Sequence, residues 1–117
     1  YDLERLAARA TWRDVEPGQV VVRQGEIGTE FFIVQVGDFT VVTNGEEHPA
    51  MHARDSFGEI ALIHSVPRTA TVTAQTVGRL LVLAGTDFLA AVTGNEDGQS
   101  IARDVANAHL RRGAVVE

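Results

Sequence analysis

The sequence predicts a mainly β domain with flanking helices, and two observations lead to that fold class. Between about residues 12 and 84, short runs rich in Val, Ile, Phe and Thr alternate with glycines, which is typical of a sandwich or barrel. On both sides of this region, apolar residues recur at the spacing of an amphipathic helix. We therefore expect one domain over residues 1–117, with a helix at about 1–11, a β-barrel at about 12–84 and two helices at about 85–112.

The first helix is predicted over residues 2–10, because its apolar residues share one face: Leu3, Leu6, Ala7 and Ala10. The Glu16-Pro17-Gly18 segment then ends any helix and turns the chain. Trp12 stands between these two segments. We expect its ring to pack where the first helix meets the barrel.

Five apolar runs are predicted as strands: Val20–Val22, Phe31–Val36, Phe39–Thr43, Thr69–Thr73 and Leu80–Leu83. Glycines fall between them, at positions 25, 28, 37, 45 and 78. Asn44-Gly45 is the strongest hairpin signal, with residues 39–43 as one arm and a polar arm near 46–49. The run Phe31–Val34 is expected in the core.

The C-terminal region is predicted as two helices. Thr86 is a suitable N-cap for a helix over Asp87–Val92, and Asn95 is expected to cap the last helix, with Glu96 and Asp97 in its first turn. The last helix would carry an apolar stripe, two arginines where cations are favoured and a glycine as its stop: Ile101, Val105, Ala108, Arg111, Arg112 and Gly113.

Composition excludes several classes of function. Sixteen acidic residues oppose ten arginines and no lysine, and the formal charge of −6 argues against non-specific binding to nucleic-acid phosphates. The absence of cysteine excludes disulfides, thiolate zinc sites and thiol nucleophiles.

The apolar runs are too short to cross a bilayer, and no signal peptide opens the chain. Because the chain starts at Tyr1 inside a helical pattern, we expect a domain cut from a longer protein.

One segment, Phe57–Ala70, contains residue types that together favour a sugar phosphate. Gly58 allows a backbone to approach a ligand closely, and residues 59–63 can form one helical turn with free amides at its start. Pro67 fixes the backbone before Arg68, whose guanidinium fork suits bidentate phosphate binding. The Glu59 carboxylate is an acceptor for a sugar hydroxyl.

This segment reads Phe-Gly-Glu-Ile-Ala-Leu-Ile, a three-residue spacer, then Pro-Arg-Thr-Ala. It resembles the phosphate-binding cassette of the cyclic-nucleotide-binding domain family at every position of the motif. Pro17-Gly18, Gly25, Gly28, Phe31–Ile33 and Gly37 also resemble the family's strand pattern, so the resemblance covers essentially the whole chain.

The resemblance implies a double-stranded β-helix, or jelly-roll, with an N-terminal helix and two C-terminal helices. It implies that Glu59 accepts from the ribose 2′-hydroxyl and that Arg68 holds the cyclic phosphate with backbone amides near Gly58 and Ala70. Thr69 would lie beside the phosphate and the base, and Arg111 over the purine. The implied ligand-binding residues are Phe57, Gly58, Glu59, Ile60, Ala61, Arg68, Thr69, Ala70 and Arg111.

By this resemblance we expect a non-enzymatic sensor of cAMP or, less favoured, cGMP, with no cofactor and a covalently attached effector. The tail after residue 110 resembles the end of some bacterial cyclic-nucleotide-gated channels, and the exclusive use of arginine is typical of a GC-rich bacterial source. We therefore favour a membrane channel or transporter as the parent, with this domain cytoplasmic and tethered to the inner face of the membrane. A kinase regulatory subunit remains open as a host.

Other interpretations of the same residues are compatible with the sequence. A jelly-roll metalloenzyme would need metal ligands, and the four histidines, at positions 48, 52, 64 and 109, include no His-x-His pair. A catabolite-activator-type transcription factor would need a helix-turn-helix after the last helix. No serine lies in a nucleophile motif. Glu59 and Arg68 on their own would be read as an ordinary surface ion pair.

Overall fold

The computed structural model describes residues 2–92 and 97–116, with side chains described through residue 110. The strands are β1 (Thr11–Val15), β2 (Val20–Val22), β3 (Glu30–Val36), β4 (Phe39–Thr43), β5 (Glu46–Met51), β6 (Ser56–Phe57), β7 (Thr71–Ala74) and β8 (Gly78–Ala84). The helices are α1 (Leu3–Arg9), α2 (Glu59–Ile63), α3 (Gly85–Val92) and α4 (Gly98–Val116). This is the predicted mainly β fold with flanking helices.

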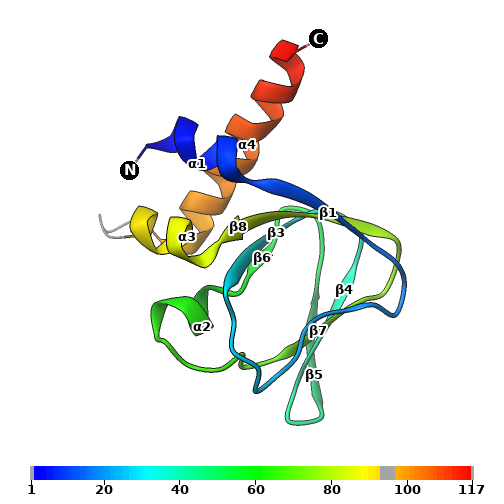
Figure 1. Cartoon of the computed structure of the whole chain (residues 1–117). Coiled ribbons are helices and arrows are strands. Elements are labelled where there is room, and N and C mark those ends of the chain that lie inside the picture. The colour runs from blue at the N-terminus through cyan, green and yellow to red at the C-terminus, as the bar shows by residue number, and fades with distance from the viewer. Residues whose placement is uncertain (1, 93–96, 117) are drawn as a thin grey trace.

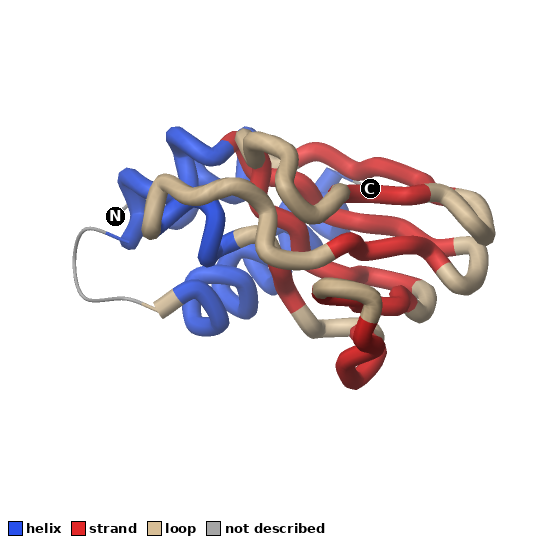
Figure 2. The backbone as a smooth tube through the Cα atoms, turned by 90° about the horizontal axis from the view of Figure 1, so that it is seen from below, coloured by secondary structure: helices blue, strands red, loops and turns tan. Residues whose placement is uncertain are grey.

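The strands form two antiparallel sheets that face each other as a jelly-roll. One sheet has the order β1-β8-β3-β6 and the other β2-β7-β4-β5. Figure 2 shows the strands running side by side, with helices at one end. In Figure 1, α1 and α4 lie above the strands, α3 lies beside the end of β8, and α2 lies on the flank of the roll.

The core has two parts, and β3 belongs to both because its side chains alternate between the faces of the sheet. Phe31 and Ile33 pack with α1, α3 and α4, and the Phe31 ring stacks on Phe88 with centroids 4.1 Å apart. Phe32 and Val34 face the interior of the roll. All four β3 residues are buried, as predicted for this run.

The predicted hairpin at Asn44-Gly45 is confirmed. Both residues have positive φ, 52° and 79°, which is the conformation that a two-residue hairpin turn requires. The second arm, β5, pairs with β4 and is almost entirely exposed. Pro49 lies in this strand, at the edge of its sheet.

Two strands were not predicted. β1 pairs with β8 from Thr11 opposite Val82 to Val15 opposite Gly78. Its own residues alternate too weakly to signal a strand, since only Val15 is buried. β6 has two residues, and it is defined by its pairing with Phe32 and Ile33.

The helix starts differ from those predicted. α3 begins at Gly85, whose amide donates to the Thr29 carbonyl at 2.7 Å, so Thr86 lies inside the helix and is not its cap. α4 begins at Gly98, and Asp97 precedes it, accepting from the Ser100 amide at 2.7 Å. This hydrogen bond lowers the pKa of Asp97.

The remaining boundary predictions fall at the two ends of α4. The expected cap Asn95 and the neighbouring Glu96 lie outside the described residues. The helix continues through Gly113 to Val116, so Gly113 does not end it. The predicted apolar stripe is confirmed, because Ile101, Val105 and Ala108 are all buried.

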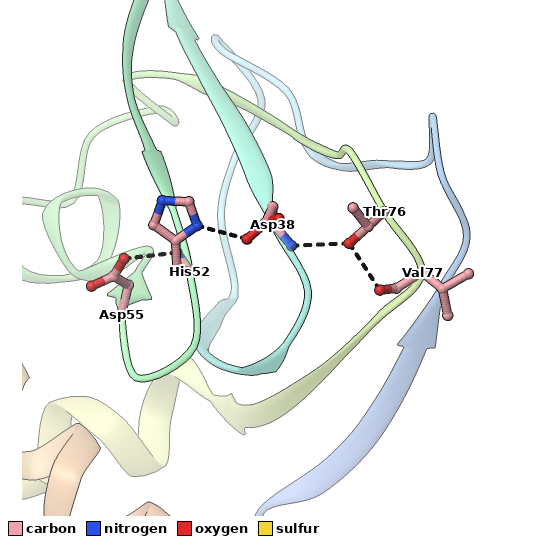
Figure 3. Close-up of polar contacts among 5 residues, drawn as sticks. All are labelled: Asp38, His52, Asp55, Thr76 and Val77. Atoms are coloured by element: carbon pink, nitrogen blue, oxygen red, sulfur yellow. Dashed lines mark hydrogen bonds and ion pairs between the residues drawn. The ribbon is translucent and has the colours of Figure 1, made fainter.

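Three turns meet at one end of the roll, where polar contacts join them (Figure 3). The Asp38 amide donates to Thr76 Oγ1 at 3.1 Å, and the Thr76 hydroxyl donates to the Val77 carbonyl at 3.0 Å. The His52 ring lies 2.6 Å from Asp38 Oδ1, and the His52 amide donates to Asp55 Oδ2 at 2.8 Å. These contacts fix the connections β3–β4, β5–β6 and β7–β8 relative to one another.

None of the described helices is both long and apolar enough for a membrane span.

Candidate ligand-binding site

A cavity of about 220 Å³ lies between α2 and the second sheet. It is lined by Phe57–Ala61 and Arg68–Ala70, which are eight of the nine residues predicted to bind a ligand. The structure therefore brings the two halves of the cassette together around one space. The ninth residue, Arg111, has a side chain outside those described.

The other wall of the cavity was not predicted from the sequence. It consists of Val22, Val41, Met51, Ser56 and Val72. Val72 pairs with Val22 on one side and with Val41 on the other, so the three valines form one inward-facing row across the sheet. Only the pairing of distant strands makes them neighbours, which a strand pattern alone does not reveal.

Gly58 lies at the turn from β6 into α2, and the position requires glycine. Its φ of 103° is strained for any other residue, and a Cβ there would lie 2.9 Å from the Glu30 carbonyl oxygen. α2 follows directly, as predicted, and its first residue is Glu59. This turn places the Glu59 side chain at the cavity.

The backbone around Arg68 is held by the connection between β2 and β3. The Arg68 amide donates to the Glu26 carbonyl, and the Gly25 amide donates to the Arg68 carbonyl, both at 2.8 Å. The guanidinium donates from Nη1 to the Gly58 carbonyl at 3.2 Å and from Nη2 to the Glu30 carbonyl at 2.7 Å. Its Cζ also lies 5.7 Å from the centre of the Phe32 ring.

Arg68 is a buried cation, with 6% of its surface exposed. Among residues 2–92 and 97–110, no carboxylate forms an ion pair with it. Burial lowers the pKa of its guanidinium, and the charges of Glu30 and Glu59 partly oppose that effect. The surface Glu59–Arg68 ion pair that the two residues alone would have indicated is therefore not formed. A buried charge without a counter-charge is costly, and an anion in the cavity would relieve that cost.

Glu59 offers the complementary group. Its Oε2 atom is buried and has no hydrogen-bond partner within the part of the chain that the structure describes. A carboxylate oxygen can only accept, so it needs a donor such as a hydroxyl. The cavity thus presents an unpaired cation and an unsatisfied acceptor to the same occupant.

Thr69 lies at the exposed rim of the cavity. Its carbonyl accepts from the Thr43 hydroxyl at 3.1 Å, which ties the rim to the β4–β5 hairpin. Its own hydroxyl has no partner within the described residues and is free for a ligand.

The last helix connects this site with α1. At its start, a Cβ on Gly98 would lie 3.6 Å from the Glu59 Cβ. Near its other end, His109 Nδ1 donates to the Ala7 carbonyl at 2.9 Å, and the imidazole and Trp12 rings form a T-shaped contact with centroids 5.0 Å apart. Trp12 lies where α1, β1 and α4 meet, with 37% of its surface exposed.

The histidines considered as metal ligands are not brought together by the fold. Across residues 2–92 and 97–110, no group of three or more metal-ligating side chains has the geometry to hold an ion. His109 is engaged by α1, and His52 lies against Asp38. The alternative of a jelly-roll metal centre gains no support from their positions.

Known proteins resemble this chain in sequence. A cAMP-dependent protein kinase regulatory subunit from Yarrowia lipolytica is 38% identical over 90 residues, covering 75% of this chain and 24% of that protein. A cyclic nucleotide-gated potassium channel from Rhizobium etli is 44% identical over 77 residues, covering 65% of this chain and 21% of the channel. The chain thus spans about a quarter or less of the length of these relatives.

The fold resembles that of solved structures as well. The structure described as cAMP-bound PfPKA-R matches 85% of this chain and 36% of its own, with a TM-score of 0.72 and 25% identity. The family model for the cyclic nucleotide-binding domain matches residues 12–95. The strand pattern, the cassette around one cavity and these matches agree, and the chain belongs to the cyclic nucleotide-binding domain family.

Proposed function

We propose that this domain is a regulatory sensor that binds a cyclic purine nucleotide, cAMP in preference to cGMP, and relays binding to an attached effector. The observation that supports this most strongly is the buried Arg68 guanidinium without a carboxylate partner, beside an unsatisfied Glu59 oxygen. A cyclic nucleotide carries an anion and a neighbouring ribose hydroxyl, which match these two groups. No step in this function requires a metal, a cofactor or a catalytic residue.

Each side chain then has a distinct role. Arg68 holds the cyclic phosphate with backbone amides near Gly58 and Ala70. Glu59 accepts from the ribose 2′-hydroxyl, and Thr69 lies beside the phosphate and the base. Phe57, Ile60 and Ala61 complete the wall of the cavity.

The signal leaves through the last helix. The start of α4 lies against Glu59, so a change in the position of that side chain reaches the helix directly. We propose that α4 closes over the occupied cavity and that Arg111 stacks on the purine. Contacts made only in the closed state supply the differential affinity that shifts the helix.

The effector is proposed to be a membrane channel or transporter, which would place this domain on the cytoplasmic face. The match to the Rhizobium etli channel supports this choice, and the match to a kinase regulatory subunit supports the alternative of a kinase. Both relatives are larger proteins of which this chain matches one part.

The test is calorimetric titration with cAMP of the wild type, Arg68→Ala and Arg68→Lys. Truncating one partner of a buried charge pair costs about 2–5 kcal/mol, so Arg68→Ala should bind roughly thirty-fold to several-thousand-fold more weakly. Lysine should restore only part, because an ammonium lacks the planar fork. Arg5→Ala, on the exposed face of α1, is the control and should bind as the wild type does. Unchanged affinity in a folded Arg68→Ala would overturn the phosphate role.

A further inference from the structure

Glu30 contacts two arginines with two different groups. Its backbone carbonyl accepts from Arg68 Nη2 at 2.7 Å. Its carboxylate forms a bidentate pair with Arg13 on β1, at 3.1 and 2.7 Å. The Cζ atom of each guanidinium also lies 5.7 Å from the centre of the Phe32 ring. The residue whose backbone carbonyl binds Arg68 therefore has its carboxylate bound to Arg13.

Arg68 lines two hollows of the domain. One is the ligand cavity of about 220 Å³ with Glu59. The other is about 140 Å³, and it is lined by Glu26 and Glu30 as well as by Arg68. The second hollow therefore offers the guanidinium an internal carboxylate, and Glu30 is the carboxylate whose charge acts most strongly on Arg68.

We propose that Arg13 keeps Arg68 available for the ligand by binding the Glu30 carboxylate, which would otherwise pair with Arg68 inside the protein. Arg13 touches no atom of the cavity, so it is a positioning residue and not a ligand contact. The inference rests on the proposed function, because it concerns the affinity of the same site for a phosphate.

The physical reason is competition between two anions for one cation. A bidentate pair between arginine and carboxylate is geometrically well matched, and Glu30 can make one such pair at a time. With Arg13 present, the Glu30 carboxylate is satisfied and Arg68 remains unpaired. Without Arg13, the carboxylate is free to draw Arg68 into an internal pair, and a ligand must break that pair before binding.

The expected size follows from the population of the competent state. If the internal pair leaves Arg68 free in about one molecule in ten, the apparent affinity falls about tenfold. Arg13→Gln should therefore weaken cAMP binding about tenfold, whereas Glu30→Gln should retain wild-type affinity because the Glu30 carboxylate no longer competes for Arg68. The double variant Arg13→Gln/Glu30→Gln should recover the affinity that Arg13→Gln loses.

Recovery of cAMP affinity in the double variant distinguishes this positioning role of Arg13 from a purely structural role. If the Arg13–Glu30 pair only stiffens β1 against β3, breaking it from either side would weaken binding equally, and the double variant would be no better. Asp14→Asn is the control, because it breaks another arginine–carboxylate pair on β1, the exposed single contact with Arg79 at 2.8 Å, which involves neither Glu30 nor Arg68. This control should bind cAMP as the wild type does.

Measuring cAMP affinity at high salt distinguishes competition by Glu30 from a general effect of losing the positive charge of Arg13. At about 1 M salt the screening length is about 3 Å, so a long-range effect of Arg13 would vanish there. The tenfold ratio between the wild type and Arg13→Gln should instead persist, because a direct Glu30–Arg68 pair would be a short-range contact of a buried guanidinium.

All titrations use calorimetry with cAMP on the folded chain. Three outcomes would each overturn this inference and leave the proposed function standing. The affinity of Arg13→Gln for cAMP could equal that of the wild type, the double variant could fail to recover the lost affinity, or the loss of affinity could disappear at high salt. Wild type that binds no cAMP would overturn the proposed function, and the inference with it.

Discussion

Gly28 lies so close to Arg68 that a Cβ built on the glycine would fall 2.3 Å from both Cζ and Nε of the guanidinium. The backbone of Gly28 has no positive φ, so its conformation would admit another residue. The requirement for glycine here therefore comes from the arginine and not from the turn.

We predict that Gly28→Ala weakens cAMP binding by at least about tenfold, or about 1.4 kcal/mol. The new methyl group meets a side chain that can move, so the guanidinium shifts and the fold is retained. Calorimetry measures the affinity, and a thermal melt shows that the domain is still folded. Wild-type affinity in this variant would show that Arg68 binds the ligand from another position.

The buried Oε2 atom of Glu59 leads to a prediction about the ribose. We expect 2′-deoxy-cAMP to bind the wild type distinctly more weakly than cAMP, because the donor to this oxygen is missing. In Glu59→Ala the two ligands should differ little. This comparison isolates the pair of Glu59 and the 2′-hydroxyl. Equal losses for the deoxy ligand in both proteins would leave Glu59 with a structural role only.

Thr69 leads to a prediction about the base. Its free hydroxyl at the rim of the cavity can accept from the 2-amino group of a syn guanine, so both nucleotides should bind, with a preference of about tenfold or less. Competition titrations with both nucleotides measure the ratio. A preference of a hundredfold in either direction would show that another residue selects the base.

The proximity of Gly98, at the start of α4, to Glu59 leads to a prediction about motion. On addition of cAMP, amide exchange should slow across residues 97–112, because the helix closes on the ligand. Arg111→Ala should weaken binding modestly, since a guanidinium on an aromatic ring contributes roughly 0.5–2 kcal/mol, and it should reduce the protection. Identical exchange with and without cAMP would mean that the signal leaves by another route.

Local signals predicted some elements well. Asn44-Gly45 determines its hairpin because both residues tolerate positive φ, and the stripe at Ile101, Val105 and Ala108 determines which face of α4 is buried. β1 has no comparable signal, since its strand character comes from pairing with β8, more than sixty residues away. The start of α3 at Gly85 depends in the same way on a distant carbonyl, that of Thr29.

In the candidate site too, the residues that are neighbours in the sequence could be predicted, and those brought together by strand pairing could not. The cassette is contiguous in the sequence, so its residues were predicted together, and they line one cavity. Val22, Val41 and Met51 reach that cavity only because β2, β4 and β5 belong to the same sheet. The pair of Arg13 and Glu30 joins two strands through side chains on the molecular surface, and nothing in the spacing of the two residues indicates it.

The edge strand β5 has a consequence for the behaviour of the domain at high concentration. An edge strand presents unpaired amides and carbonyls on which a strand from another molecule can add, which is the first step of aggregation. Pro49 removes one of those amides, and Glu46 and Glu47 add repulsive charge to the same strand. These features oppose intermolecular strand addition along the exposed hairpin, so we expect the open edge to resist aggregation at high protein concentration.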